Sequence, residues 1–288
     1  MNPQITGHTR LCCLLGTPIA HSISPMIHNE AFRMLGLDFV YLCFDTKHAD
    51  LKTMIQTLRE MNVLGFNLTM PDKERILPYL DELSPAAAMI GAVNTVKNEN
   101  GRLIGHNTDG IGFMQSVKDT GYDIRSGEMT LLGAGGAASS IAVQAALDGV
   151  PALHIINRKG RSWNNAIRLA TLINERTGCR ADVTDFADVA AVKNAVRQSS
   201  LLANATSIGM APDTDASPIV DTSCFHSGLL VSDIIYNPRF TKLMLDAKAA
   251  GCRTANGLYM LLYQGAAAFH IWTGCEMPID AIREKYFS

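Results

Sequence analysis

A glycine-rich segment follows a short apolar run at 129–132 and opens a stretch of small residues: Gly133, Ala134, Gly135, Gly136 and Ala137. With the next alanine it reads G-x-G-x-x-A, the pattern that binds a dinucleotide where a strand turns into a helix. The glycines permit a tight turn and a close approach to a pyrophosphate, and the helix N-terminus offers N–H groups to the phosphates. A plain glycine turn is the alternative, but the strand and helix on either side favour a cofactor.

The next predicted strand, at 152–156, ends in Asn157, Arg158 and Lys159, with Arg161 shortly after. Proteins that bind NAD usually carry an acidic residue here, which hydrogen-bonds the adenosine ribose. Guanidinium and ammonium groups instead attract a 2′-phosphate. The segment therefore favours NADP over NAD, with a solvated basic loop as the alternative.

Polar side chains gather in three further places, each at the predicted end of a strand, where open α/β sheets bind their ligands. They are the segments 21–25, 67–73 and 91–95, the last followed by 105–110. Asn and Thr are frequent there and can present directional donors and acceptors to a polyhydroxylated ligand. Simpler interpretations stay open, because Ser24 before a proline could be a helix N-cap and Thr108-Asp109-Gly110 could be a turn.

Short apolar runs and longer amphipathic stretches alternate along the chain and would position these groups. The first series predicts strands at 10–15, 39–44 and 65–69 and helices at 25–35 and 51–60. The second predicts strands at 129–132, 152–156, 180–183, 201–204 and 228–233 and helices at 137–147, 163–175, 241–250 and 258–272. This rhythm indicates an α/β protein with mainly parallel sheets covered by helices, and a boundary between 111 and 127.

Composition limits the classes of function. The 288 residues suggest two domains, and 47% apolar residues supply a core. A net charge of −2 argues against a nucleic-acid binder, and we expect no membrane span and no secretory signal. The seven cysteines are odd in number and irregularly spaced, which predicts reduced thiols and a cytoplasmic protein.

Seven motifs together resemble shikimate dehydrogenases, and the sequence is also similar to the quinate/shikimate dehydrogenase branch of that family. They cover essentially the whole chain, in family order: 67–73, 91–95, 107–110, 133–138, 157–158, 204–210 and 263–266. The resemblance implies an N-terminal α/β substrate-binding catalytic domain at 1–112, completed by C-terminal helices from about 255 to 288. It also implies a Rossmann-type, doubly wound domain for NADP or NAD at 113–254.

By the same resemblance, Lys73 and Asp109 match the catalytic pair. Positions matching the substrate site are Ser22, Ser24, Tyr41, Thr69, Asn94, Thr108 and Gln264, with Tyr41 near the substrate in quinate-using members. Besides the glycine segment, positions matching the cofactor site are Asn157, Arg158, Ile234, Tyr236, Asn237 and Gly257. Lys159, by its charge, and Thr206 and Ser207 are also expected at the cofactor site.

The implied activity interconverts shikimate and 3-dehydroshikimate, and quinate and 3-dehydroquinate, in aromatic amino acid biosynthesis. Lys73 would accept the hydroxyl proton as hydride leaves the carbinol carbon, while Asp109 shares that proton or orients Lys73. Gly160 stands where quinate-using, NAD-accepting members often carry an acid, which again favours NADP. A related cyclic hydroxy or amino acid as substrate, or a non-catalytic dinucleotide sensor, are the alternatives.

The histidines near the motifs lack metal-ligand spacing. We therefore predict no metal, and interpret His21, His28 and His106 as satisfied structural side chains. A homodimer is left open.

Overall fold

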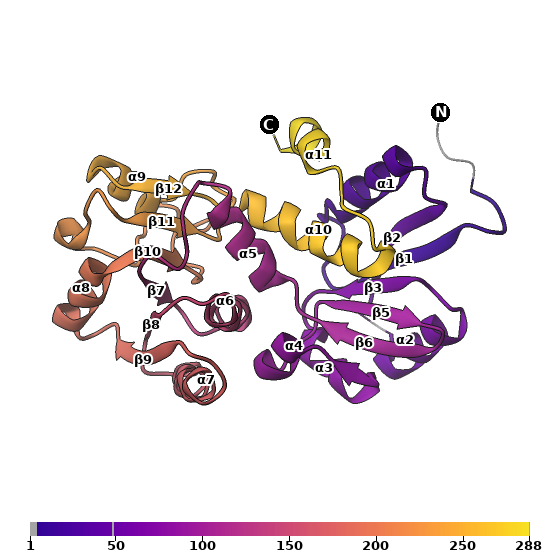
Figure 1. Cartoon of the computed structure of the whole chain (residues 1–288), viewed down its shortest axis with the longest axis horizontal. Helices are drawn as coiled ribbons and strands as arrows, with labels where there is room; N and C mark the ends of the chain where they lie inside the picture. Colours follow the sequence, from indigo (N-terminus) through magenta and orange to yellow (C-terminus); the bar gives the residue numbers. More distant parts are fainter. Residues whose placement is uncertain (1–4, 48, 288) are drawn as a thin grey trace. The chain divides into compact units, whose positions relative to one another are not determined.

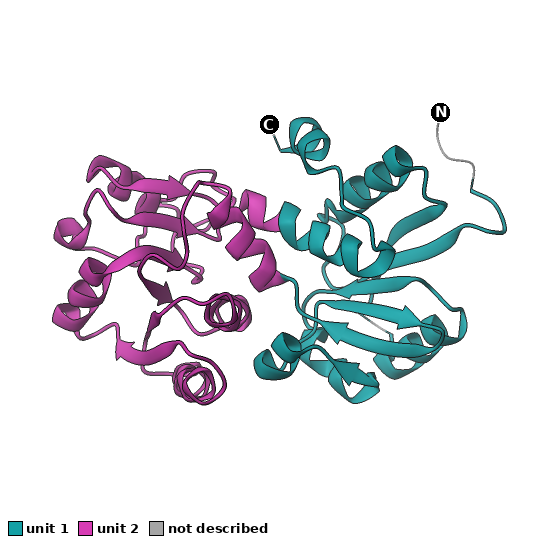
Figure 2. Ribbon diagram, viewed as in Figure 1, with its two compact units in different colours: residues 1–108, 262–288 teal, residues 109–261 magenta. Residues whose placement is uncertain are grey.

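The computed structural model describes residues 5–47 and 49–287. It divides into two compact units (Figure 2): unit 1 holds residues 1–108 and 262–288, and unit 2 holds residues 109–261. The predicted boundary lay after residue 112, whereas the contacts group residues 109–112 with unit 2. Each unit carries one six-stranded sheet (Figure 1), which confirms the predicted α/β fold class.

Unit 1 is built on a mixed sheet with the strand order β2-β1-β3-β5-β6-β4. Its strands are β1 (Arg10–Gly16), β2 (Phe39–Asp45), β3 (Gly65–Leu68), β4 (Glu82–Leu83), β5 (Thr95–Glu99) and β6 (Arg102–His106). Its helical segments are α1 (Ser24–Leu35), α2 (Leu51–Glu60), α3 (Asp72–Arg75), η1 (Leu77–Tyr79), α4 (Pro85–Ile90) and α11 (Ile279–Tyr286). Helix α10 (Leu258–Thr273) begins in unit 2 and continues into unit 1.

The hairpin β5–β6, which was not predicted, adds an antiparallel part to a sheet whose other strand pairs, β1–β2, β1–β3 and β4–β6, are parallel as expected. Strand β5 runs antiparallel to both β3 and β6. Asn100 and Gly101 form its turn with φ of 55° and 92°, the left-handed conformation that Asn-Gly adopts readily in two-residue hairpins. That dipeptide was the signal in the sequence that could have predicted the hairpin.

Apolar side chains fill both faces of this sheet. One core cluster joins α2 to the sheet through Ile55, Leu58 and Phe66. On another face Trp272 of α10 fills the space above Gly65, where a Cβ would lie 2.3 Å from the indole nitrogen. The indole N–H donates to the Val96 carbonyl oxygen at 2.9 Å. The C-terminal part of α10 is thus fixed to unit 1.

Unit 2 is a fully parallel sheet with the strand order β12-β11-β10-β7-β8-β9. Its strands are β7 (Glu128–Leu132), β8 (Ala152–Asn157), β9 (Arg180–Asp185), β10 (Ser199–Asn204), β11 (Leu230–Asp233) and β12 (Arg253–Ala255). Its helical segments are α5 (Asp109–Lys118), α6 (Gly136–Leu147), α7 (Trp163–Arg176), α8 (Val189–Gln198), η2 (Thr222–Cys224) and α9 (Lys242–Ala249). This is the doubly wound arrangement that was expected.

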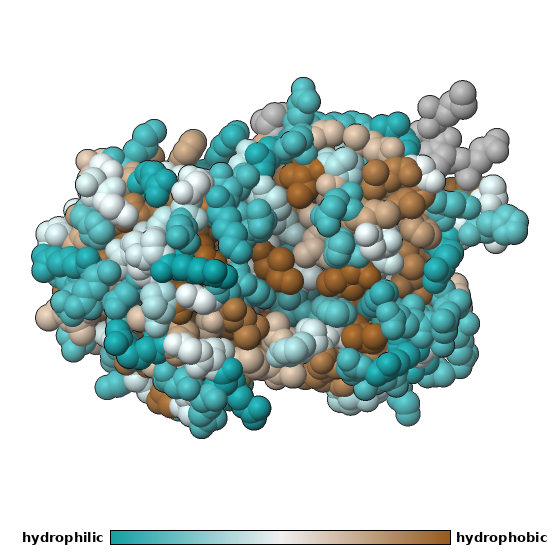
Figure 3. All heavy atoms as spheres, viewed as in Figure 1, coloured by the Kyte–Doolittle hydropathy of each residue, from teal (hydrophilic) through white to brown (hydrophobic). Residues whose placement is uncertain are grey.

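All the predicted helices and strands occur, with ends shifted by one to a few residues. The elements missed were mostly short, together with α5, α8 and α11. The cysteines are free, as predicted, and most are buried. Within the described residues, no helix is long and apolar enough to cross a membrane. Figure 3 shows apolar surface on unit 1 in the region where Figure 1 draws α1 and β2.

Candidate active site

The glycine segment of unit 2 forms the expected cradle at the start of α6. Gly133 has φ of 103°, and a Cβ there would lie 3.1 Å from the Ala205 carbonyl oxygen, so β7 and the end of β10 approach closely. At Gly135 and Gly136 an added Cβ would meet no described atom within 4 Å. The backbone at these two glycines is therefore not covered by side chains, which leaves room for the pyrophosphate of a dinucleotide at the start of α6.

The loop after β8 carries the residues expected to bind the adenosine ribose and its 2′-phosphate. The Asn157 amide donates to the Arg158 carbonyl at 3.1 Å and to the Ser162 hydroxyl at 3.0 Å, so it shapes the loop. Arg158 is exposed. The Lys159 ammonium lies 3.8 Å from the Asp185 carboxylate and 5.9 Å from the Trp163 ring centroid. Arg158 is therefore the better placed cation for a 2′-phosphate.

The segment predicted to line the nicotinamide lies after β11. A Cβ on Gly257 would lie 1.9 Å from the Ile234 carbonyl oxygen, so that glycine allows two segments to meet. Tyr236 and Asn237 are exposed, whereas Ile234 is half-buried.

A buried polar cluster beneath this segment was not predicted. The Asn204 amide donates to both carboxylate oxygens of Asp233 at 3.1 Å, and the Thr241 hydroxyl donates to one of them at 2.8 Å. Asn204 also accepts from the Thr206 hydroxyl at 2.7 Å. Burial raises the pKa of Asp233, against the lowering effect of these hydrogen bonds. The ends of β10 and β11 are thereby joined, which places Thr206 beside Gly133.

In unit 1, Lys73 lies on the short helix α3, which is held from both sides. Asp72 is 1% exposed and accepts from the Thr46 hydroxyl at 2.8 Å and from Arg75 at 2.8 Å. The Lys73 carbonyl accepts from the Val93 N–H at 2.8 Å. Lys73 is therefore fixed to the segment that carries Asn94.

Asn94 and Thr108 are brought together as a buried pair. The Thr108 N–H donates to Asn94 Oδ1 at 2.8 Å, and Asn94 Nδ2 donates to Thr108 Oγ1 at 3.0 Å. Thr95 Oγ1 lies 3.0 Å from Asn94 Oδ1. Two predicted substrate-binding residues thus share one network.

Tyr41 is placed differently from a residue that touches substrate. It is fully buried, its hydroxyl donates to Asn67 Oδ1 at 2.7 Å, and its ring stacks on His28 at 4.5 Å between centroids. Burial raises its pKa well above the ordinary value. The Tyr41 hydroxyl thus contacts Asn67 and also forms a hydrogen bond with Ser24, a predicted substrate-binding residue.

Three further residues of the predicted substrate site lie near the buried Tyr41 and His28: Ser22, Ser24 and Gln264. Ser24 is the first residue of α1, whose N-cap is Ile23, so the interpretation of Ser24 as an N-cap is wrong. The Ser24 N–H donates to Ser22 Oγ at 3.3 Å. Gln264 is half-buried on α10, one residue before Gly265, which leaves room for His28.

The expectation that His28 is a structural side chain with satisfied hydrogen bonds is wrong. Among the residues that the structure describes, its Nδ1 is buried without a hydrogen-bond partner. It is therefore an aromatic core residue rather than a satisfied polar one.

Asp109 is the first residue of α5 in unit 2. The next residue, Gly110, packs against Ser140 and Gln144 of α6. At its other end α5 carries Lys118, whose ammonium lies 3.2 Å from the Asp148 carboxylate beyond α6. Helices α5 and α6 therefore pack against each other, and Asp109 is fixed relative to the helix of the phosphate cradle.

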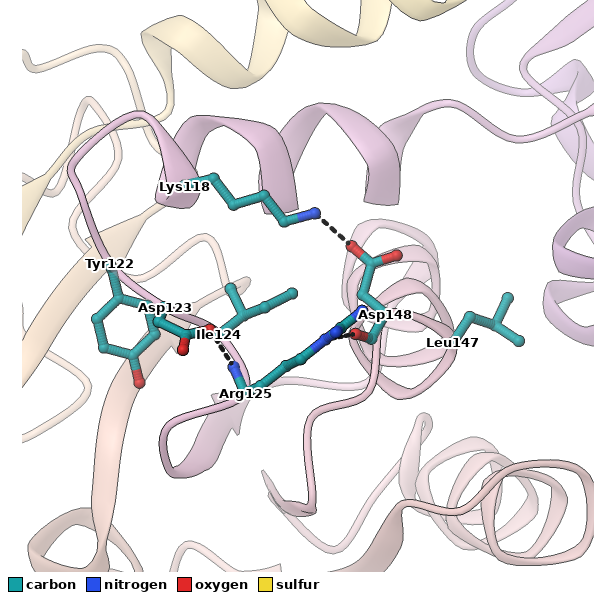
Figure 4. A pocket seen from close by; sticks show the side chains of 7 residues that line it. All are labelled: Lys118, Tyr122, Asp123, Ile124, Arg125, Leu147 and Asp148. Carbon is teal, nitrogen blue, oxygen red and sulfur yellow. Dashed lines mark hydrogen bonds and ion pairs between the residues drawn. The ribbon is translucent and has the colours of Figure 1, made fainter.

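A pocket lies around the contact between Lys118 and Asp148 (Figure 4), and its volume is about 480 Å³. Its cations are engaged, because Lys118 points to Asp148 and the Arg125 side chain donates to the Asp148 carbonyl at 3.2 Å. None of its lining residues was predicted to be functional. Within the described part of the chain, no group of three or more His, Cys, Asp and Glu side chains could hold a metal ion.

Comparison with known proteins identifies the family of the chain. Residues 14–96 match the shikimate dehydrogenase substrate binding domain, and residues 257–285 match the shikimate 5'-dehydrogenase C-terminal domain. Shikimate dehydrogenase (NADP(+)) of Listeria monocytogenes is 48% identical over 99% of this chain and 98% of its own length. The chain belongs to the shikimate dehydrogenase family.

Solved structures extend this relationship across the family. A shikimate 5-dehydrogenase from Listeria monocytogenes, in complex with shikimate and NAD, is 47% identical with a TM-score of 0.95, covering 99% of this chain and 98% of that one. Quinate dehydrogenase from Corynebacterium glutamicum, in complex with NAD, is 30% identical with a TM-score of 0.87, covering 97% and 98%. The resemblance to this family, and to its quinate-using branch, is thereby confirmed.

Proposed function

We propose that this chain is an NAD(P)-dependent dehydrogenase that interconverts shikimate and 3-dehydroshikimate, and also quinate and 3-dehydroquinate. The observation that carries the proposal is the bond between the Lys73 carbonyl and the Val93 N–H, which joins a lysine to the Asn94–Thr108 pair. Lys73, whose amine can move a proton, and the Asn94–Thr108 pair, which can bind hydroxyl groups, thus lie on adjoining segments of unit 1. We call these segments the rim of unit 1. The near full-length relationship to an enzyme solved with shikimate supports the same substrate class.

The division of labour follows from the two units. Unit 1 would bind the ring acid through Ser22, Ser24, Thr69, Asn94, Thr108 and Gln264. Unit 2 would hold the dinucleotide at the N-terminus of α6 and, through Arg158, at its 2′-phosphate. When the dinucleotide is bound, its oxidised nicotinamide ring would accept the hydride from the substrate.

Lys73 then takes the proton of the substrate hydroxyl as the carbinol C–H bond breaks, and in the reverse direction its ammonium returns that proton to the ketone oxygen. Asp109 is proposed to share the proton or to orient Lys73. We infer NADP as the preferred cofactor, because Arg158 is exposed and Gly160 provides no acid to oppose a phosphate.

Absorbance of the reduced nicotinamide, recorded with shikimate and quinate and with each cofactor, tests the proposal. Reduction with shikimate or quinate supports it, with the higher rate expected for NADP. Absence of reduction in every pairing would favour another cyclic acid or a dinucleotide sensor. Proposed too are a cytoplasmic location, which the free cysteines support, and a homodimer, which sedimentation velocity would test.

A further inference from the structure

The buried residues below the rim of unit 1 form one continuous chain of hydrogen bonds, which we call the Asn67 network: Tyr41, Asn67, Thr95, Asn94 and Thr108. All five are buried, and the most exposed of them, Asn67, is 7% exposed. It joins strands β2, β3 and β5 to the two predicted substrate-binding residues.

The direction of the hydrogen bonds is fixed by one acceptor. The Asn94 carbonyl oxygen can only accept, and it lies 3.0 Å from Asn67 Nδ2. The second proton of that amide group goes to Thr95 Oγ1 at 2.9 Å. Asn67 Oδ1 is then left to accept, and the Tyr41 hydroxyl donates to it at 2.7 Å.

The same reasoning gives the direction of the hydrogen bonds from Thr95 to Asn94 and Thr108. Since Thr95 Oγ1 accepts from Asn67, its own proton is available for Asn94 Oδ1 at 3.0 Å. Asn94 Oδ1 also accepts the Thr108 N–H. The orientation of the Asn94 amide is therefore set by the Thr108 N–H and supported from below through Thr95 and Asn67, whose Oδ1 accepts from the buried Tyr41 hydroxyl.

Tyr41 is itself held firmly. The Asn29 side chain accepts from the Tyr41 N–H at 2.8 Å and donates to its carbonyl at 2.9 Å, so it occupies the outer edge of β2. The ring lies against His28 and, at 6.0 Å, Trp272. An anchored phenol can impose an orientation on the amide that it contacts, because little side-chain freedom remains to be lost.

We propose that Tyr41 and Asn67 are positioning residues, which orient the Asn94 amide and the Thr108 hydroxyl for the hydroxyl groups of a ring acid. This inference rests on the proposed function, which supplies the ligand. It assigns to Tyr41 a role exerted through Asn67 rather than by contact with substrate.

The test uses the full chain with three single variants. Tyr41→Phe removes the hydroxyl alone, Asn67→Leu removes the central amide, and Asn98→Leu is the matched control. Asn98 is 4% exposed on β5 and accepts from the Gly101 N–H at 2.8 Å, outside the network. All three lose a buried hydrogen bond, so a loss of stability by itself does not distinguish them.

Two readouts separate positioning from a merely structural role. We expect the KM for shikimate to rise about tenfold in Tyr41→Phe and Asn67→Leu, the order expected for a misoriented hydrogen bond, with the KM for NADP within about twofold of wild type. Hydrogen exchange at the Thr108 amide should quicken in both variants, because its acceptor is loosened. Asn98→Leu should change neither the KM for shikimate nor the exchange rate of the Thr108 amide. The double variant Tyr41→Phe/Asn67→Leu should lose no more than Asn67→Leu.

Unchanged KM for shikimate together with unchanged exchange at Thr108 would overturn the inference, even if both variants melt at a lower temperature. A shikimate KM that rises equally in Asn98→Leu would also overturn it. Failure of the proposed function has a different signature, which is a wild-type protein that reduces neither cofactor with any ring acid. In that case the exchange rate of the Thr108 amide still decides whether Tyr41 orients Asn94.

Discussion

Gly110 lies so close to Ser140 that a Cβ atom added to it would stand 2.2 Å from the Ser140 carbonyl oxygen. A backbone oxygen on a helix cannot move aside as the end of a flexible side chain can. The contact lets α5 lie directly against α6, and it immediately follows Asp109. One small residue therefore links the position of a proposed catalytic carboxylate to the helix of the phosphate cradle.

The variant Gly110→Ala should lower kcat about 100-fold while unit 2 stays folded, because α5 must shift away from α6 and carry Asp109 with it. Steady-state kinetics and far-UV circular dichroism provide the measurement. Gly178→Ala is the control, since a Cβ there would meet no described atom within 4 Å. Equal kcat values for the two variants would show that the close contact does not position Asp109.

Replacing Lys73 with alanine should reduce turnover by about 10² to 10⁴, the range of general acid–base catalysis. The fold should persist, because α3 is held through the buried Asp72 and through the Lys73 backbone carbonyl, which the substitution keeps. Lys97→Ala is the control on the neighbouring strand β5, where the lysine forms a partly exposed ion pair with Glu99. Turnover near the wild-type value in Lys73→Ala would remove Lys73 from the mechanism.

Arg158→Ala should raise the KM for NADP by about 10- to 100-fold, as expected for loss of a charge-assisted contact to a phosphate. The KM for NAD should change little, because NAD carries no 2′-phosphate. Lys159→Ala should have the smaller effect, since that ammonium already lies toward Asp185. The comparison needs only the KM for each cofactor. Equal losses for NADP and NAD in Arg158→Ala would contradict the role of the guanidinium.

The sequence predicts the parts of this fold that are governed by local patterns. The glycine segment and its flanking strand and helix follow from spacing alone, and the observed α6 begins at Gly136 beside it. The hairpin β5–β6 was missed because its strands are short and carry few apolar residues, although Asn100-Gly101 marks the turn.

What the sequence could not predict depends on contacts between distant segments. That the Tyr41 hydroxyl reaches Asn67, and that the Asn157 amide folds back on its own loop, follow from strand register and loop closure. Lys159 was assigned to the cofactor by its charge, and its contact with Asp185 on β9 could not be predicted from that charge. Residue type therefore predicts what a side chain can do, and tertiary packing determines with which partner it does so.

His154 should make unit 2 less stable as pH rises. Its ring lies between two carboxylates, with Nδ1 2.8 Å from Asp182 and Nε2 2.9 Å from Glu128. The hydrogen bond to Asp182, and then that to Glu128, raise its pKa against the effect of burial. The ion pairs therefore contribute fully below the ordinary histidine pKa, near 6.5, and are lost as pH rises through the higher folded value.

We expect the Tm of wild type to exceed that of His154→Gln at pH 6 by about 2–4 °C, with a smaller difference at pH 9. Trp163 fluorescence in a Trp272→Phe background reports on unit 2. A difference that is constant over this range would exclude titration of His154 as the cause.

His28 should make unit 1 less stable as pH falls, the opposite of the effect of His154 on unit 2. Complete burial lowers its pKa from 6.5 to about 3. Below pH 6.5 the unfolded chain binds a proton that the folded chain cannot, so the free energy of unfolding falls by up to about 1.4 kcal/mol per pH unit until the folded pKa is reached. Between pH 7 and pH 5 this amounts to about 2 kcal/mol.

His28→Phe should remove this part of the acid sensitivity, since a phenyl ring can stack between Tyr41 and Phe269 without titrating. Urea unfolding at both pH values measures it, with Trp272 as the reporter in a Trp163→Phe background. His8→Phe, at an exposed position, is the control and should keep the wild-type dependence. If His28→Phe loses as much stability as wild type between pH 7 and pH 5, the acid sensitivity of unit 1 has its origin in other groups.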